Sequence, residues 1–192
     1  MAKTSRTAGK ATYVALLRGI NLGGHKIVKM AQLRKEFEEL GFDDVKTYIQ
    51  SGNVVFKAPS CACEDLAKRI QERVLRQFGF PVPVVVKTAD EIGEVIKNNP
   101  LMKQKDIDLS KLHVTFLWSA PEKSTLKMLH AISAAPDEFH CSAQAVYLHC
   151  PNGYGVTKLG NNVLEKMLKV GTTTRNWRTV NQLYQMTLDE KD

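Results

Sequence analysis

The sequence predicts an α+β protein whose two halves share one topology. In the first half, short apolar runs suited to strands alternate with two stretches whose apolar residues recur at helical spacing. The second half repeats that alternation of elements, without a matching repeat of residues. With 192 residues, 43% of them hydrophobic and 24% charged, the chain has an ordinary globular composition. It is long enough for one domain with a substantial core or for two small ones.

The first half, residues 13–88, is predicted to order its elements as strand, helix, strand, strand, helix, strand. The turn residues Ser51-Gly52-Asn53 join the two middle strands as a hairpin. Gly41 and Gly79 follow the two helical stretches, where a glycine commonly ends a helix. The order βαββαβ is typical of ferredoxin-like folds. The predicted strands are 13–17, 45–49, 54–56 and 81–86, and the predicted helices are 30–40 and 62–78.

Residues 89–111 are predicted as a helix followed by a polar linker, and residues 112–192 as a second ferredoxin-like module with a terminal helix. The threonine-rich stretch GTTTRN stands where the last strand of this module is expected, so that strand is either weak or replaced. The other predicted elements are a strand at 112–118, a helix starting near Pro121, a hairpin of 138–142 and 145–150, and helices at 161–169 and 177–188.

The net charge of +7 is concentrated at the start of the chain. The first 29 residues contain no Asp or Glu, whereas the rest of the chain carries 21 basic and 20 acidic residues. This asymmetry favours an anionic partner, a nucleic acid or a phosphate, over a uniformly basic surface. The alternative is a solvated tail plus an ordinary basic loop. We predict that residues 1–12 form a disordered basic tail. The early cations are Lys3, Arg6, Lys10, Arg18, Lys26 and Lys29.

We expect a cytoplasmic, reduced protein with no membrane partner, no metal and no cofactor. No apolar run approaches the roughly 20 residues of a membrane span, and the first twelve residues lack the apolar segment of a secretory signal. Four cysteines are too few for a disulfide scaffold. With Ala143-Gln144 as its turn, the predicted hairpin pairs Cys141 with Val146 and separates Cys141 from Cys150 by roughly 13 Å. That distance is too far for a shared metal or a disulfide. Cys61 and Cys63 do not have CxxC spacing.

The main candidate site is the glycine-rich loop RGINLGG after the first strand. Its glycines have the wrong spacing for a Walker A sequence or for GxGxxG. Glycines nevertheless let backbone N–H groups approach an anion, and a helix N-terminus follows near Met30. The alternative is that the glycines only satisfy backbone geometry and that Arg18 pairs with a carboxylate. The predicted ligand-binding residues of this loop are Arg18, Gly19, Asn21, Gly23, Gly24 and Lys26.

A second candidate is the stretch before the last helix, where hydroxyls, a guanidinium and an amide precede a helix N-terminus. Thr174 or Asn176 could instead cap that helix. If both stretches served one ligand, a single anion would lie between Arg18 and Arg175. The hairpin turn at Gly52 is a third, secondary candidate for a ligand-facing edge. The predicted residues of these two stretches are Thr173, Thr174, Arg175 and Asn176, and Ser51 and Asn53.

The stretch ALLRGINLGGHKIVKMAQLRKEFEELGFDDVKTYIQSGNVVF resembles the opening of a bacterial family known as domain of unknown function 1697. The similarity continues through FGFPVPVVVKT, LHVTFL and TTTRNWRTV. The resemblance implies a pair of ferredoxin-like modules and no established activity. His25 and the cysteines of Cys61–Cys63 depart from the family pattern, so any chemistry at those residues would be peculiar to this protein.

The leading functional hypothesis is a protein that binds an anionic partner, either a nucleic acid or a phosphorylated small molecule. The absence of an RNP-like run such as KGFGFV counts against the RNA version. One alternative is an enzyme acting on a phosphorylated metabolite, with Arg18, Lys26 and Arg175 stabilising charge. No nucleophile elbow or HExxH sequence supports hydrolytic chemistry. Another alternative is a homo-oligomeric scaffold.

Overall fold

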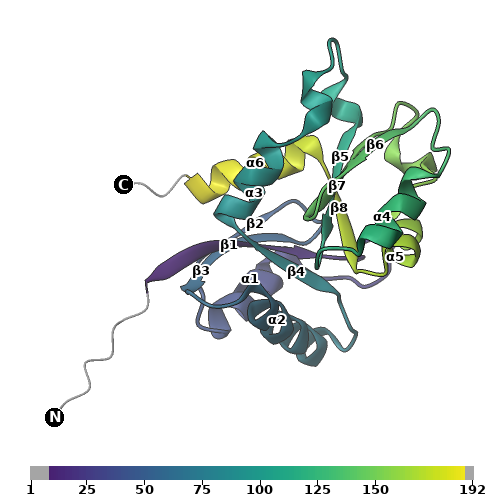
Figure 1. Ribbon diagram of the computed structural model, residues 1–192. Helices are drawn as coiled ribbons and strands as arrows, with labels where there is room; N and C mark the ends of the chain where they lie inside the picture. Colours follow the sequence, from purple (N-terminus) through teal and green to yellow (C-terminus); the bar gives the residue numbers. More distant parts are fainter. Residues whose placement is uncertain (1–8, 189–192) are drawn as a thin grey trace. The chain divides into compact units, whose positions relative to one another are not determined.

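The computed structural model describes residues 9–188, and the chain divides into two compact units (Figure 1). Unit 1 comprises Met1–Ala89 with Met186–Asp192, and unit 2 comprises Asp90–Gln185. Among the described residues, each unit contains one four-stranded antiparallel sheet, ordered β2-β3-β1-β4 in unit 1 and β6-β7-β5-β8 in unit 2. Both sheets have the strand order of a ferredoxin-like module, so the predicted fold class is confirmed.

Unit 1 follows the predicted βαββαβ order. Its two middle strands form the predicted hairpin, and its four strands pair antiparallel throughout. The elements are β1 (Lys10–Leu17), α1 (Met30–Glu39), β2 (Asp43–Tyr48), β3 (Asn53–Pro59), α2 (Cys63–Phe78) and β4 (Val84–Thr88).

The first strand begins earlier than expected. β1 starts at Lys10 rather than at Tyr13, and Lys10 pairs with Pro59 at the far end of β3. The Lys10 ammonium lies 2.5 Å from a carboxylate oxygen of Asp43. Residues 10–12 of the expected tail therefore belong to the sheet, and residues 1–8 lie outside the described part of the chain.

The core of unit 1 lies between its sheet and the two helices α1 and α2. Phe56 of β3 is at its centre, with its ring 5.3 Å from that of Phe37, 4.7 Å from that of Phe42 and 5.7 Å from that of Tyr13. Aromatic pairs at these distances add to the free energy of burying the rings themselves. α2 contributes its buried face through Leu66, Ile70 and Val74.

The end of β2 differs from the predicted alternation of Val45, Thr47 and Ile49. β2 ends at Tyr48, and Ile49 lies in the turn with a positive φ of 46° and an exposed side chain. Positive φ is rare for a β-branched residue, because its side chain crowds the backbone. Asp44 also has a positive φ, of 49°, where the pairing of β2 with β3 shifts register. The apolar–polar pattern does not reveal this bulge.

Unit 2 contains a complete second βαββαβ module. The threonine-rich stretch forms the strand β8, which pairs with β5 from Leu117↔Thr172 to His113↔Asn176. The hairpin pairs Cys141 with Val146, the predicted register. The elements after β4 are α3 (Ala89–Lys97), β5 (Leu112–Leu117), α4 (Lys123–His130), β6 (Glu138–Cys141), β7 (Ala145–His149), α5 (Asn161–Leu168), β8 (Thr172–Asn176) and α6 (Trp177–Leu188), with 3-10 turns η1 (Pro100–Lys103), η2 (Leu109–Lys111) and η3 (Tyr154–Val156).

On one face of its sheet, unit 2 packs α4 and α5 over apolar residues of β5 and β7. Leu117, Val146 and Leu148 supply the strand side of this core, and Leu129 and Leu164 supply the helix side. The linker that was predicted as merely polar contains η1 and η2, each capped by a side chain. Their caps are Asn99, which accepts from Leu101 N–H, and Asp108, which accepts from Ser110 N–H.

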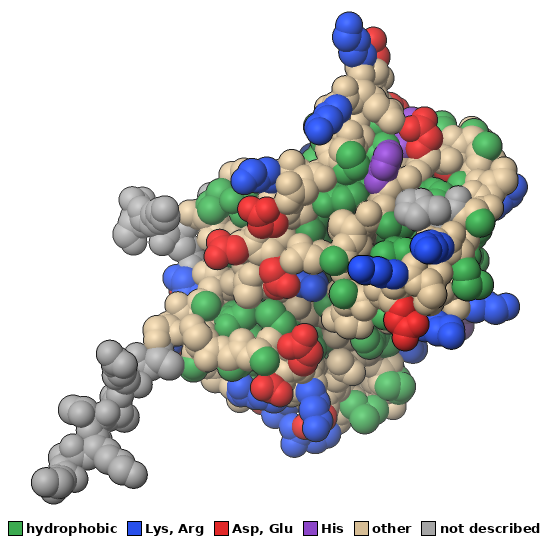
Figure 2. Space-filling model, in the orientation of Figure 1, with side chains coloured by type: hydrophobic (Ala, Val, Ile, Leu, Met, Phe, Trp, Pro, Cys, Tyr) green, Lys and Arg blue, Asp and Glu red, His purple; other side chains and the backbone are tan. Residues whose placement is uncertain are grey.

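The described surface carries charges of both signs. On the face drawn in Figure 2, basic and acidic side chains are interspersed. Between residues 9 and 188, no helix combines the length and the apolar composition that a membrane span requires.

Replacing Leu66 by alanine should lower the free energy of unfolding by about 2–5 kcal/mol, because it empties space in a closed core. Leu75, on the same helix but 47% exposed, is the matched control. Leu75→Ala should change stability by no more than about 0.5 kcal/mol. Urea unfolding followed by circular dichroism measures both, and equal losses would contradict this assignment of the buried face of α2.

Candidate functional site

The first loop folds back on itself as a miniature hairpin. Asn21 N–H donates to Lys26 O at 3.1 Å, and His25 N–H donates to Leu22 O at 3.0 Å. Gly23 and Gly24 occupy the turn, with φ of 56° and 80°. Two successive residues with positive φ are what the tightest hairpin turns require, and glycine supplies them without strain. We call Asn21–Lys26 the loop hairpin.

The side chain of Asn21 fixes the loop hairpin to the rest of unit 1. Its amide nitrogen donates to Val28 O at 2.9 Å and to Gln50 O at 2.8 Å, and its amide oxygen accepts from Val28 N–H at 2.8 Å. Asn21 itself has a φ of 54°, a conformation that asparagine tolerates better than most residues. The predicted ligand-binding role of Asn21 would therefore compete with three structural hydrogen bonds.

Two further loops lie at the same end of the unit 1 sheet. Leu17 N–H donates to Gly52 O at 2.8 Å, and Arg18 N–H donates to Pro83 O at 2.9 Å. The contact with Gly52 is so close that a Cβ there would lie 2.7 Å from the Cβ of Leu17. The structure thus brings the first loop beside the Ser51–Asn53 turn, which the sequence pattern alone did not indicate.

The lysine of the loop hairpin is held in place. The Lys26 ammonium donates to Pro81 O at 3.1 Å and lies 6.0 Å from the centre of the Phe80 ring. A cation over an aromatic face at this distance gains a modest electrostatic attraction. Lys26 is nevertheless exposed to solvent, as is Lys29, which precedes the first residue of α1.

Apolar side chains are also exposed here. Leu22 is 64% exposed and Ile27 is 57% exposed, on either side of Lys26 in the sequence. Among the described residues, the first acidic side chain along the chain is that of Glu36, in α1. The first turn of α1 has no side-chain cap, so its N–H groups add to the positive potential at this end of unit 1.

The two predicted residues of the β2–β3 turn, Ser51 and Asn53, bond to each other. Asn53 is fully buried, and its amide nitrogen donates to Tyr48 O at 3.0 Å and to Ser51 Oγ at 2.9 Å. These bonds stabilise the turn whose Gln50 carbonyl accepts a hydrogen bond from Asn21. Ser51 and Asn53 therefore lie close to the loop hairpin and support its position.

The second predicted stretch lies in unit 2 and is largely buried. Arg175 is 8% exposed, and its Nη1 donates to Thr173 Oγ1 and to Thr174 O, both at 2.9 Å. Burial lowers the pKa of the Arg175 guanidinium to about 10, so it remains a cation at neutral pH. Asn176 caps α6 by accepting from Thr179 N–H at 2.8 Å, one of the two capping alternatives that the sequence offered.

Thr174 belongs to a network of hydroxyls that the sequence did not reveal. Its Oγ1 donates to Asn161 Oδ1 at 2.8 Å, accepts from the Tyr154 hydroxyl at 2.9 Å, and lies 2.7 Å from Thr115 Oγ1. The four residues come from α5, η3, β5 and β8, separated by up to 59 positions in the sequence. The network joins the edge strand β8 to the elements that cover it.

A histidine stacks on this network. The His113 ring lies 4.9 Å from the Tyr154 ring with 25° between their planes. His113 Nδ1 lies 3.1 Å from Lys111 O, and because a carbonyl only accepts, Nδ1 carries the proton. Burial lowers the pKa of His113 below its ordinary value, so the ring is neutral in the folded protein at neutral pH.

No group of three or more His, Cys, Asp or Glu side chains suitable for a metal ion occurs in residues 9–188. The four cysteines are free thiols. Cys150 is buried, Cys141 is half-buried, and burial raises the pKa of the Cys141 thiol to about 11. That shift keeps the Cys141 thiol protonated at neutral pH, which makes it a poor nucleophile.

Comparison with known proteins identifies the family of this chain and a solved structure with a similar fold. The family described as "Protein of unknown function (DUF1697)" matches residues 11–147, which include the first loop and end before the Thr173–Asn176 stretch. The structure of the conserved bacterial protein SP0830 from Streptococcus pneumoniae is similar to this chain with a TM-score of 0.72 and 22% sequence identity. The similarity covers 93% of this chain and 99% of that one. No curated protein matches.

Replacing Asn21 by glycine should lower the free energy of unfolding by about 1–3 kcal/mol, because it leaves Val28 N–H and two carbonyls without their partner. Glycine keeps the positive φ accessible, so the loss reports the side chain alone. Asn152→Gly, at an exposed turn position in unit 2, is the control and should have little effect. Chemical unfolding measures both. Equal stabilities of Asn21→Gly and the parent protein would show that the amide does not anchor the loop.

The stability of the protein should fall as the pH drops below about 6.5 partly through His113. A histidine whose pKa is lowered by folding takes up its proton more readily in the unfolded chain. Its contribution is therefore complete above the unfolded pKa, near 6.5, and is lost as the pH falls towards the folded pKa. His113→Phe keeps a ring against Tyr154 and should flatten the stability profile between pH 7 and pH 5. An unchanged profile would refute the assignment.

Proposed function

The chain belongs to the DUF1697 family of proteins of unknown function, and we propose that it binds an anionic ligand, a nucleic acid or a phosphorylated small molecule, through the first loop of unit 1. The observation that carries the proposal is the exposed cationic hairpin within a stretch that has no acidic residue before Glu36. Lys26 and Lys29 supply the charge.

Rigidity of the loop supports the proposal. A ligand that meets a loop already held in one conformation loses less entropy on binding. Asn21 holds the backbone of the loop hairpin through three hydrogen bonds, and Pro81 O holds the Lys26 ammonium. In this proposal Asn21, Ser51 and Asn53 position the loop rather than contact the ligand.

Among the described residues, the Lys26 ammonium is not paired with a carboxylate, whereas that of Lys10 is. Lys10 forms its ion pair with Asp43 at the opposite end of β1. The acceptor of the Lys26 ammonium is a neutral carbonyl, which leaves its formal charge uncompensated. A phosphate oxygen would therefore gain attraction to Lys26 without displacing a carboxylate.

The form of the loop favours an extended anion over a small one. Phosphorylated small molecules usually bind in concave sites that enclose them, whereas Lys26, Ile27 and Lys29 are exposed. A polyanion can contact separated lysines on an open surface and releases counterions as it does so. Of the two ligand classes, a single-stranded nucleic acid backbone matches that geometry better.

The Thr173–Asn176 stretch has a structural role in unit 2 and is not part of the proposed site. Arg175, Thr173 and Thr174 bond to one another within unit 2, and Asn176 caps α6. Unit 2 is then a folded partner domain whose contribution to binding does not depend on these four residues. The loop of unit 1 provides the ligand contact.

Replacing both Lys26 and Lys29 by glutamine should weaken binding of a fluorescein-labelled single-stranded dodecanucleotide several-fold at low salt. The slope of log affinity against log salt should also become shallower by up to about 1.4, since each lysine on a single strand's phosphate contributes about 0.7. Fluorescence anisotropy at several salt concentrations gives both numbers.

The matched control is Lys123→Gln with Lys127→Gln, two exposed lysines of α4 in unit 2. This pair removes the same formal charge and should leave the salt slope unchanged. The same two double variants are compared with a nucleoside triphosphate in place of the oligonucleotide. If the unit 1 and unit 2 variants weaken binding of both ligands equally, the first loop is not the site.

A further inference from the structure

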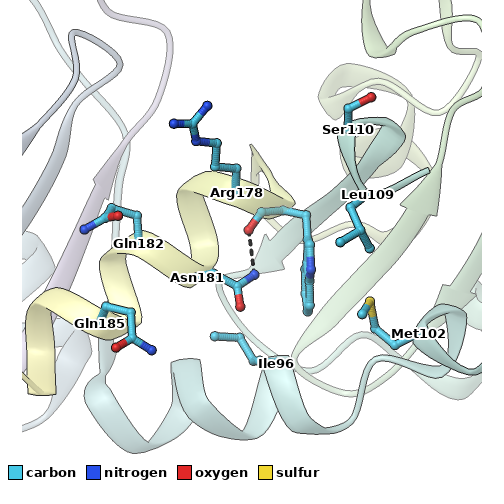
Figure 3. A pocket seen from close by; sticks show the side chains of 9 residues that line it. Ile96, Met102, Leu109, Ser110, Arg178, Asn181, Gln182 and Gln185 are labelled. Atoms are coloured by element: carbon cyan, nitrogen blue, oxygen red, sulfur yellow. Dashed lines mark hydrogen bonds between the residues drawn. The ribbon is translucent and has the colours of Figure 1, made fainter. Parts of the chain in front are cut away.

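Unit 2 contains a pocket of about 810 Å³ between α6 and the segment that runs from α3 through η1 and η2 (Figure 3). This volume is within the roughly 300–1,000 Å³ of sites that bind small molecules. All of its lining belongs to unit 2. The pocket is lined by Ile96, Met102, Leu109, Ser110, Trp177, Arg178, Asn181, Gln182 and Gln185.

One side of the pocket is apolar. Ile96 comes from α3, Met102 from η1 and Leu109 from η2, and they face Trp177 at the start of α6. Met102 and Leu109 are exposed, although burial of apolar side chains of their size is favourable. In Figure 3 these side chains border the same open space, below and to the right of α6. A ligand with an apolar body would cover them.

The other side is polar and comes from one face of α6. Arg178, Asn181, Gln182 and Gln185 stand at positions i, i+3, i+4 and i+7, which share a helix face. The Asn181 amide nitrogen donates to Trp177 O at 2.8 Å, which fixes the amide one helical turn from Trp177. The two glutamines lie further along α6 and can donate or accept hydrogen bonds.

The charge of the lining has one sign. Of the nine lining side chains, Arg178 alone carries a formal charge, and none is acidic. Its exposed side chain extends from the rim, away from the apolar residues (Figure 3), so the guanidinium is within reach of solvent. The neighbouring acid Asp108 is engaged in capping η2 through Ser110 N–H. An anionic head group at the rim would therefore meet attraction and no acidic lining residue.

We propose that this pocket binds a small amphipathic monoanion, with an aromatic or acyl body against Trp177, Met102 and Leu109 and a carboxylate or sulfonate near Arg178. The apolar side of the pocket calls for an apolar body in the ligand, and the single guanidinium calls for an anionic head group. Because a guanidinium binds two oxygens side by side, a planar carboxylate suits it well. None of its lining residues belongs to the first loop, and all of them lie in unit 2.

Two dyes of one shape test both parts of the proposal. 1-Anilinonaphthalene-8-sulfonate carries the apolar body and one negative charge, and N-phenyl-1-naphthylamine has the same body without the charge. The full-length protein should bind one molecule of the sulfonate with enhanced dye fluorescence, and should bind the neutral dye more weakly. Decanoate should displace the sulfonate at lower concentration than decanol does.

Variants locate the two contacts. Leu109→Asp should abolish binding of both dyes, whereas Leu75→Asp should not, because Leu75 is equally exposed but lies in unit 1. Arg178→Gln should weaken binding of the sulfonate roughly five-fold, the order expected for one charged contact at an exposed rim, and leave the neutral dye unaffected. Lys26→Gln, which alters the first loop, should leave both unchanged.

Three results would overturn the proposal. The first is equal binding of the sulfonate by the parent protein and Leu109→Asp, with both folded by circular dichroism. The second is equal affinity for the two dyes, which would remove the role of Arg178. The third is that sedimentation shows the parent protein to be a dimer and Leu109→Asp to be a monomer, while the parent binds neither dye. In that case a second copy covers the pocket.

Discussion

One side-chain amide determines the shape of the exposed end of unit 1. Asn21 closes the loop hairpin by bonding both backbone groups of Val28, and it ties the loop to the β2–β3 turn through Gln50 O. This turn is stabilised by the hydrogen bonds of buried Asn53 and by the close contact of Gly52 with Leu17. Two asparagines and one glycine thus set where the Lys26 charge is presented, although none of the three is itself charged.

The sequence predicted the fold because local signals agreed with the global topology. Helical spacing placed α2 and α6 within a residue of their observed limits, and the turn at Ala143-Gln144 set the register that pairs Cys141 with Val146. Its failures are also physical. The threonine-rich stretch predicts a strand that is weak or replaced, yet Thr115, Tyr154 and Asn161 from distant segments stabilise β8. Ile49 continued an alternating pattern, but the turn ended the strand before it.

The candidate site was harder to predict from the sequence, because composition does not show which way a side chain points. Arg175, Asn53 and Asn21 have the residue types of an anion site, and each is engaged by its own unit in the structure. Nothing in the sequence indicated that Leu22 and Ile27 are exposed, because apolar residues are ordinarily assigned to a core. The unit 2 pocket was missed for a related reason. Its apolar wall is made partly by η1 and η2, inside a stretch whose composition indicates only a polar linker.

The edge strand β8 has a consequence for how the protein behaves at high concentration. An edge strand presents backbone groups that can pair with another chain and begin aggregation. Thr172 N–H donates instead to the Glu165 carboxylate at 2.8 Å, and the Thr172 hydroxyl bonds to Asn161. A side chain from α5 thereby takes the place that a foreign strand would occupy at this end of β8. β2 is an edge strand of the unit 1 sheet. The register shift between Asp43 and Lys46 interrupts its regular backbone pairing, as bulges do at the edges of natural sheets. In this protein, protection against pairing with a foreign strand is therefore built into the borders of both sheets.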